Sequence, residues 1–149
     1  MSETRRVVQN HFSQSAENYS RSPIHASGID LQWMLELHPL TGAERVLDVG
    51  TGIGYAAFAF APHVKSVEGI DITPAMLEQA ELAAAERGIE NVTFSQGDVE
   101  AIPREDASYD IVLSRWCAHH YVNIRKAVAE IARVLRRGGV FILADSVVP

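Results

Sequence analysis

The sequence lacks the features that mark secreted, disulfide-stabilised and membrane-spanning proteins. Its single cysteine, Cys117, cannot form an intramolecular disulfide, which fits a reducing compartment. No run reaches the roughly 18 apolar residues that a membrane span needs. The N-terminal segment MSETRRVVQNHFSQ also lacks the apolar core of a signal peptide. We therefore expect a cytoplasmic protein with no membrane partner.

Basic residues are sparse and scattered along the chain. Lys and Arg together number 13 against 19 Asp and Glu, which gives a formal charge of −6. No basic cluster exceeds the pairs Arg5-Arg6 and Arg136-Arg137. Because binding to a phosphate backbone requires a basic face, we expect no nucleic-acid partner. The 149 residues are enough for one domain with a single core.

Apolar strands alternate with helical segments through most of the chain. The strands are expected at Arg45–Val49, Val67–Ile72, Asn91–Ser95, Tyr109–Ser114 and Val140–Ala144. Each is an unbroken apolar run, which is typical of a parallel sheet covered by helices on both faces. The pattern predicts an α/β fold with about five parallel strands.

The expected helices lie between these strands and ahead of them. Their expected spans are Ile24–Leu37, Ile53–Ala61, a helix capped by Thr73 and ended before Gly88, and a helix over residues 124–135 that Gly138-Gly139 stops. The polar segment before them is expected to be a helix or a mobile arm. We therefore divide the chain into an N-terminal helical arm or lid, residues 1–40, and a sheet domain, residues 41–149.

A glycine-rich loop follows the first expected strand in the stretch LDVGTGIG, residues 47–54. Glycines allow a tight turn and the close approach of a ligand to the backbone, and a plain turn needs only one of them. The spacing G-x-G-x-G departs from the dinucleotide pattern G-x-G-x-x-G. Asp48, two residues before the first glycine, would repel a phosphate and would attract a cationic group. The loop therefore favours a positively charged nucleoside over NAD, and it makes a NAD-dependent oxidoreductase the weaker interpretation.

Two more carboxylates follow the next two strands. Asp71 ends the second strand, where an acidic side chain can accept hydrogen bonds from ribose hydroxyls. Asp98 follows the third strand, where it can accept a hydrogen bond from an adenine amino group. Ile72 and Val99 offer apolar faces to the base. Any one strand-end aspartate is more often a cap or turn residue, so the prediction depends on all three occurring together.

Taken together, five segments of this sequence resemble the class I S-adenosylmethionine-dependent methyltransferases. The segments are VLDVGTGIG, VEGIDITPAML, VTFSQGDVEAIP, YDIVLSRWCAHH and EIARVLRRGGVFILAD, and they follow the family's order over about two-thirds of the chain. The sequence is most similar to the small-molecule branch that includes the ubiquinone/menaquinone-biosynthesis C-methyltransferases. The resemblance implies a Rossmann-like, doubly wound sheet in the order 3-2-1-4-5.

The resemblance also implies roles for individual residues around S-adenosylmethionine as cofactor. Gly50, Thr51 and Gly52 would line its methionine end, with Asp48 near the ammonium group. Asp71 would hold the ribose. The remaining implied contacts are Ile72 and Met76 beside the base, Asp98 and Val99 at the adenine, Ser114 at the methionine portion and Tyr19 in a covering N-terminal segment.

The chain departs from this family in one respect. The usual sheet has seven strands, and the sixth and seventh are missing here, so the sequence reads as truncated after the fifth strand. That strand would then form a sheet edge, and the apolar VFILADSVV is poorly suited to exposure. We expect a second copy of the chain to cover it in a homodimer.

The expected activity is methyl transfer to a small-molecule acceptor. The alternative is an S-adenosylmethionine-binding module, or an enzyme fragment without activity of its own. His119 and His120 follow the fourth strand and are candidates for a general base, although either could instead cap or pack the next helix. Cys117 is the weaker candidate for a nucleophile. Adjacent side chains point to different sides of a helix or strand, so we expect no metal site.

Overall fold

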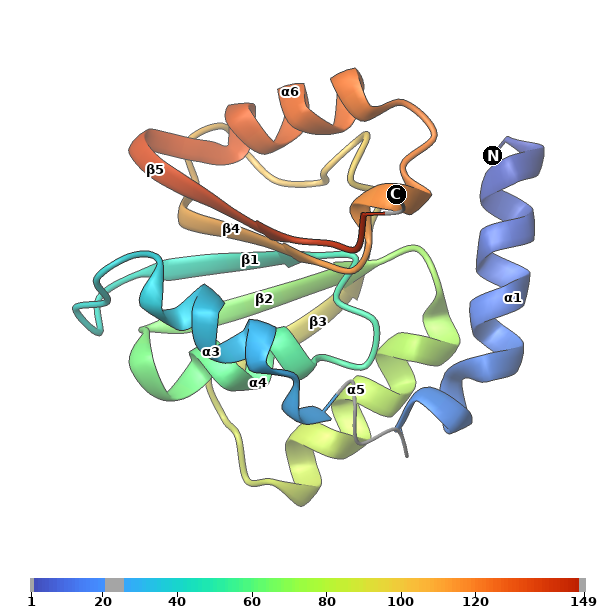
Figure 1. The fold of residues 1–149 in the computed structure, drawn as a ribbon, viewed down its shortest axis with the longest axis horizontal. Coiled ribbons are helices and arrows are strands. Elements are labelled where there is room, and N and C mark those ends of the chain that lie inside the picture. The colour runs from blue at the N-terminus through green and yellow to red at the C-terminus, as the bar shows by residue number, and fades with distance from the viewer. Residues whose placement is uncertain (1, 21–25, 148–149) are drawn as a thin grey trace.

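Five parallel strands form a single sheet with helices on both faces (Figure 1). The computed structural model describes residues 2–20 and 26–147. The strand order is β3-β2-β1-β4-β5, and every neighbouring pair is parallel, which confirms the predicted fold class and order. The strands are β1 (Arg45–Val49), β2 (Ser66–Asp71), β3 (Val92–Gln96), β4 (Tyr109–Arg115) and β5 (Leu135–Ala144).

The helices pack in two layers, one on each face of the sheet. This is because the strand order reverses: β2 and β3 extend the sheet on one side of β1, and β4 and β5 extend it on the other. They are α1 (Glu3–Ser20), α3 (Ile29–Glu36), α4 (Tyr55–Phe60), α5 (Pro74–Glu86) and α6 (Ile124–Val134), with the short 3₁₀ helices η1 (Ala61–His63) and η2 (Ala118–His120). Right-handed crossovers place α4 and α5 on one face and α6 on the other. The reversal lies between β1 and β4, which is where ligands bind in such sheets. No described helix is both long and apolar enough to cross a membrane.

The N-terminal helix α1 stands beside the sheet at the carboxyl ends of the strands and packs on α5 (Figure 1). The polar segment expected to be a helix or an arm is therefore helical over Glu3–Ser20. The helix expected over Ile24–Leu37 corresponds to α3, which begins only at Ile29, because Gly28 before it has an extended backbone. Residues 21–25 lie outside the described residues. The division of the chain at residue 40 stays a prediction.

The end of α6 differs from the expectation drawn from Gly138-Gly139. The helix ends at Val134, and β5 begins at the next residue. The last carbonyl groups of α6 are taken by the connection before β4: Ala107 N donates to Arg133 O at 2.9 Å and Ser108 N to Val134 O at 2.8 Å. The two glycines instead lie in an irregularity of β5, between the segments that pair with β4.

A half-buried polar network joins three strands of the sheet. Glu68 on β2 accepts hydrogen bonds from Tyr109 Oη on β4 and from Arg104 Nε, each at 2.8 Å. Arg104 also donates to Ser95 Oγ on β3. Burial raises the pKa of the Glu68 carboxyl, but the bonds from Arg104 and Tyr109 outweigh burial and hold the pKa below its usual value. The ionised carboxylate therefore stabilises the folded state.

We predict that Glu68→Gln lowers the free energy of unfolding by about 1–3 kcal/mol at neutral pH, since Tyr109 and Arg104 lose a charged partner. The lowered folded-state pKa means that this stabilisation is present above the unfolded pKa and is lost as pH falls through the folded pKa. The difference between the two proteins should therefore shrink below about pH 4.5. Urea unfolding measures the free energy of unfolding of both proteins. Glu78→Gln on the exposed face of α5 is the control. Equal losses in both variants would contradict the prediction.

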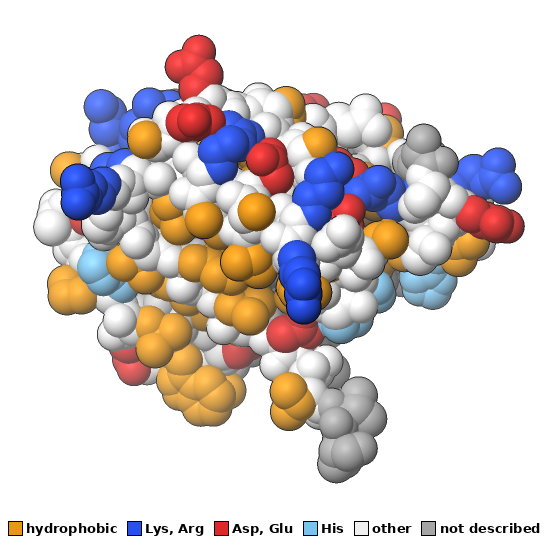
Figure 2. Space-filling model, turned by 90° about the horizontal axis from the view of Figure 1, so that it is seen from above, with side chains coloured by type: hydrophobic (Ala, Val, Ile, Leu, Met, Phe, Trp, Pro, Cys, Tyr) orange, Lys and Arg blue, Asp and Glu red, His pale blue; other side chains and the backbone are white. Residues whose placement is uncertain are grey.

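β5 is the last strand of the described sheet, and apolar side chains flank its outer edge. Leu143 on β5 is 48 % exposed. On neighbouring α3, which packs against β5, Ile29 and Trp33 are exposed four residues apart. Figure 2 looks down on the side that carries β5 and α6 and shows many apolar side chains gathered there. The second copy expected to cover this edge stays a prediction.

We predict that the chain forms dimers at micromolar concentration and that Leu143→Lys converts them to monomers. A lysine on an open strand edge opposes pairing with another edge because its charge would have to be buried. Light scattering gives the mass of each species. Leu82→Lys on α5, at a residue that is 59 % exposed, is the matched control and should remain dimeric. A monomeric wild-type chain would count against the dimer.

Candidate functional site

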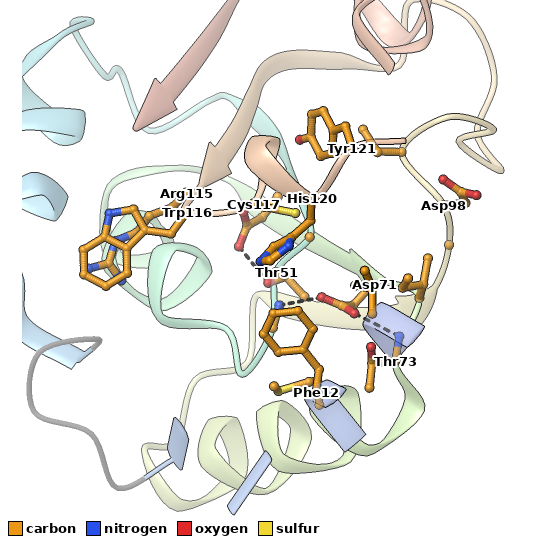
Figure 3. A pocket seen from close by; sticks show the side chains of 18 of the residues that line it. Phe12, Thr51, Asp71, Thr73, Asp98, Arg115, Trp116, Cys117, His120 and Tyr121 are labelled. Carbon is orange, nitrogen blue, oxygen red and sulfur yellow. Dashed lines mark hydrogen bonds between the residues drawn. The ribbon is translucent and has the colours of Figure 1, made fainter. Parts of the chain in front are cut away.

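A cavity of about 410 Å³ lies at the carboxyl ends of the strands, between the sheet and α1 (Figure 3). Its walls come from the loop after β1, the ends of β2 and β3, the segment after β4, and the inner face of α1. Most of the predicted site residues line it. They are Asp48, Gly50, Thr51, Gly52, Asp71, Ile72, Met76, Asp98, Val99, His119 and His120.

Two residues predicted to contact the cofactor are not among the described residues that line the cavity. Ser114 at the end of β4 is fully buried and does not line the cavity. Its hydroxyl is instead 2.8 Å from Tyr121 Oη, so Tyr121 stands in front of it and lines the cavity in its place. Tyr19 belongs to α1, but its side chain lies outside the described residues.

The glycine loop after β1 is held close to the segment after β4. Gly50 has a φ of +66° and Gly52 a φ of +55°, both in the left-handed region that favours glycine. A Cβ on Gly50 would overlap Cys117 Sγ and would lie 2.9 Å from Cys117 Cβ, whereas a Cβ on Gly52 would meet nothing. Gly50 is therefore required for packing, and Gly52 leaves the backbone open to the cavity.

Asp48 is a buried carboxylate at the base of the cavity. Its Oδ2 accepts a hydrogen bond from Thr51 Oγ1 at 2.7 Å. Burial raises the pKa of Asp48 to about 7, and the nearby charge of Asp71 adds to the rise. A carboxylate in this position gains from a cationic ligand, because burial disfavours its charged form and a nearby positive charge favours it.

Asp71 is fixed at the end of β2 by two backbone N–H groups. Gly52 N donates to Oδ2 and Thr73 N to Oδ1, each at 2.9 Å (Figure 3). Burial raises the pKa of Asp71, although these hydrogen bonds act in the opposite direction. Thr73 begins α5, but its hydroxyl makes no capping bond, and this buried Oγ1 has no hydrogen-bond partner at the cavity wall. The carboxylate keeps further lone pairs for a ligand's hydroxyl groups.

Asp98 lies at the other end of the cavity and already has a cationic partner. Arg5 on α1 places Nε 2.9 Å from Asp98 Oδ2, and it also pairs with Glu100. Gln9 of the same helix donates to the carbonyl oxygen of Ile72 at 2.7 Å. These contacts hold α1 over the cavity, so a ligand amino group would share Asp98 with Arg5.

His119 and His120 lie together rather than on opposite sides. Both are in η2, and their ring centroids are 3.9 Å apart. His119 Nδ1 is 2.7 Å from Asp145 Oδ1, and the His120 ring meets the Phe12 ring of α1 edge-on at 5.1 Å. Partners from β5 and α1 therefore bring the two imidazoles to one side. The described residues contain no group of three His, Cys, Asp or Glu side chains suited to a metal ion.

Cys117 is half-buried beside the glycine loop and lines the cavity. Burial raises the pKa of its thiol, and the nearby carboxylates Asp71 and Asp48 raise it further. A thiol that keeps its proton is a poor nucleophile. Cys117 therefore serves packing against Gly50, which agrees with its weak rank as a nucleophile.

Sequence reasoning missed several cavity residues that come from distant segments. Arg5, Val8 and Phe12 all lie on one face of α1, at spacings of three and four residues. That spacing was visible in the sequence, but nothing in it indicated that α1 docks on this end of the sheet. Tyr121 was missed because it lies in an irregular segment between η2 and α6.

We predict that Gly50→Ala costs about 2–4 kcal/mol of stability, because the new methyl adds about 1–3 kcal/mol of overpacking to a left-handed backbone cost of about 1 kcal/mol. Gly52→Ala, the matched control, should lose only the backbone part, since its Cβ meets nothing. Urea unfolding gives both values.

Adding Cys117→Ala to the Gly50→Ala protein should restore part of the loss, because it removes the overlapping sulfur but leaves Cβ. Equal losses at the two glycines, or no recovery in the double variant, would refute the packing explanation.

The chain is similar to known methyltransferases along most of its length. The sequence profile of a family described as a methyltransferase domain matches residues 47–143. An uncharacterized methyltransferase of Bacillus subtilis, YcgJ, is 44 % identical over 138 residues, which cover 93 % of this chain and 54 % of YcgJ. A ubiquinone/menaquinone biosynthesis C-methyltransferase of Bdellovibrio bacteriovorus, UbiE, is 34 % identical over 89 % of this chain and 59 % of UbiE. The chain thus spans between half and two-thirds of the length of these relatives.

Solved structures agree with the fold. The crystal structure of YcgJ superposes with a TM-score of 0.78 over 80 % of this chain and 51 % of that chain. A SAM-dependent methyltransferase from Aquifex aeolicus shares the fold with a TM-score of 0.72 at 23 % identity, over 83 % of this chain and 67 % of that chain.

Proposed function

Because the chain belongs to the methyltransferase-domain family, we propose that it binds S-adenosylmethionine and transfers the methyl group to a small-molecule acceptor. One observation carries the proposal: the three strand-end carboxylates Asp48, Asp71 and Asp98 line a single cavity beside a glycine loop. A pocket of this size lies within the range of small-ligand sites. Its negative wall suits a cationic nucleoside and opposes a pyrophosphate.

The residues of the cavity fit this cofactor from one end to the other. Asp71 would hold the ribose hydroxyls, because two N–H groups already fix its carboxylate. The unpartnered hydroxyl of Thr73 is a further polar atom at the same wall. Asp48 would face the ammonium group, and Asp98 the adenine amino group. The bound cofactor would supply a methyl group on a sulfonium, which is already activated for transfer, so the protein would contribute mainly positioning.

The acceptor is proposed to be small because the cavity is covered. Phe12 of α1 and the η2 segment close over it, which leaves room for a compact molecule (Figure 3). The acidic charge of −6 opposes a nucleic-acid acceptor. The last two residues of β4 and the two that follow read SRWC, without the Asn/Asp-Pro-Pro-aromatic motif of nucleic-acid amino methyltransferases.

We predict that isothermal titration detects binding of S-adenosylmethionine and that affinity rises between about pH 5.5 and pH 7. The ligand's cation binds the ionised carboxylate, so protonation of Asp48, whose pKa is raised to about 7, weakens binding as pH falls. Titration in buffers of different ionisation enthalpy should show proton release. In Asp48→Asn the rise should be smaller, because the buried carboxylate of Asp48 no longer titrates. Asp106→Asn, at a side chain that is 78 % exposed, is the control.

A product assay against a panel of acceptors then separates the two candidate functions. Binding with turnover supports the methyltransferase, and binding without turnover across the panel supports a binding module or an inactive fragment. Binding of NAD without binding of S-adenosylmethionine would overturn both.

A further inference from the structure

The His119 imidazole is held by a single carboxylate through two contacts. Asp145, just after β5, places Oδ1 2.7 Å from His119 Nδ1. Its other oxygen, Oδ2, accepts the backbone N–H of His119 at 3.1 Å. The Asp145 side chain is 14 % exposed, whereas the His119 side chain is 45 % exposed. Both oxygens of one carboxylate therefore fix the position and the orientation of one histidine.

This pairing selects the tautomer of His119. Burial raises the pKa of Asp145, but the hydrogen bonds from His119 and Ser146 outweigh burial and hold the pKa below its usual value. An ionised carboxylate only accepts hydrogen bonds, so the ring proton of His119 must lie on Nδ1. Nε2 then carries the lone pair and is the atom of the ring that can take a proton. A base oriented by a third group in this way is the arrangement that enzymes use to direct proton transfer.

The neighbouring groups favour His119 over His120 as the base. Both rings line the cavity. Burial lowers the pKa of His120, and the adjacent His119 lowers it further. The Phe12 ring holds His120 by an aromatic edge contact, and no carboxylate is hydrogen-bonded to it among the described residues. His119 is therefore the imidazole that a carboxylate orients.

We propose that His119 is the general base of the methyl transfer and that Asp145 is its positioning residue, which requires an acceptor whose reacting group carries a removable proton. This inference rests on the proposed function. His119 Nε2 takes the proton from the acceptor, and the electron pair of the broken bond to hydrogen forms the new bond to the methyl carbon. The methyl–sulfur bond breaks and its pair stays on sulfur, which becomes a neutral thioether. Asp145 offsets the charge of the imidazolium.

The first test reads the tautomer in the protein without ligand. Nitrogen-15 NMR of the histidine side chains should show the proton of His119 on Nδ1. In Asp145→Ala, the ring loses the acceptor that holds its proton on Nδ1, so a substantial part of the proton population should move to Nε2. Asp106→Ala is the matched control and should leave the spectrum of His119 unchanged. An unaltered tautomer in Asp145→Ala would overturn the role of Asp145.

The second test measures turnover with an acceptor that the wild-type protein methylates. Both His119→Gln and Asp145→Ala should lower kcat by about 100-fold or more while the affinity for S-adenosylmethionine changes less than about twofold. His63→Gln, at an exposed histidine of η1, should keep wild-type turnover. Full turnover in His119→Gln with cofactor binding intact would overturn the general base. Failure of the wild-type protein to bind the cofactor would instead remove the proposed function and leave the NMR result interpretable.

Discussion

The site depends on two carboxylates that lie close together at the carboxyl ends of the neighbouring strands β1 and β2. Burial raises the pKa of Asp48, and the charge of the half-buried Asp71 raises it further. Hydrogen bonds from the Thr51 hydroxyl and from the amides of Gly52 and Thr73, together with the charge of Arg115, offset part of this repulsion. A cationic ligand would relieve the rest. Gly52 suits this place because its backbone N–H reaches Asp71 while the absence of a side chain leaves the cavity open.

The sheet was predictable because each strand is a short apolar run with turn residues after it. Such runs are buried on both faces, and that alone indicates parallel pairing. The end of α6 could not be predicted from local sequence. Gly138-Gly139 is a strong signal for the end of a helix, but the helix stops earlier because Ala107 and Ser108 bond its last carbonyl groups. Those donors lie far back in the chain, and only the folded arrangement brings them to the helix.

The sequence predicted the site residues that directly follow a strand, but not those that come from distant segments of the chain. Asp48, Asp71 and Asp98 were found because the carboxyl ends of parallel strands meet at one edge. Arg5 was not, because nothing local indicates where α1 docks. The two histidines were expected to diverge, as neighbours do in regular structure, but η2 and the contacts with Asp145 and Phe12 turn both toward one side.

The ion pair between Arg5 and Asp98 makes the two ends of the cavity electrostatically different. Arg5 neutralises the acidic groups at the α1 end, where Asp98 and Glu100 lie. At the other end, the Asp48 carboxylate accepts a hydrogen bond from the Thr51 hydroxyl, and the guanidinium of Arg115, which also lines the cavity, is paired with Asp30. The electrical potential therefore changes along the length of the cavity, from compensated at one end to negative at the other. An elongated molecule with an uncharged ring at one end and a cation at the other can enter this gradient favourably in only one orientation.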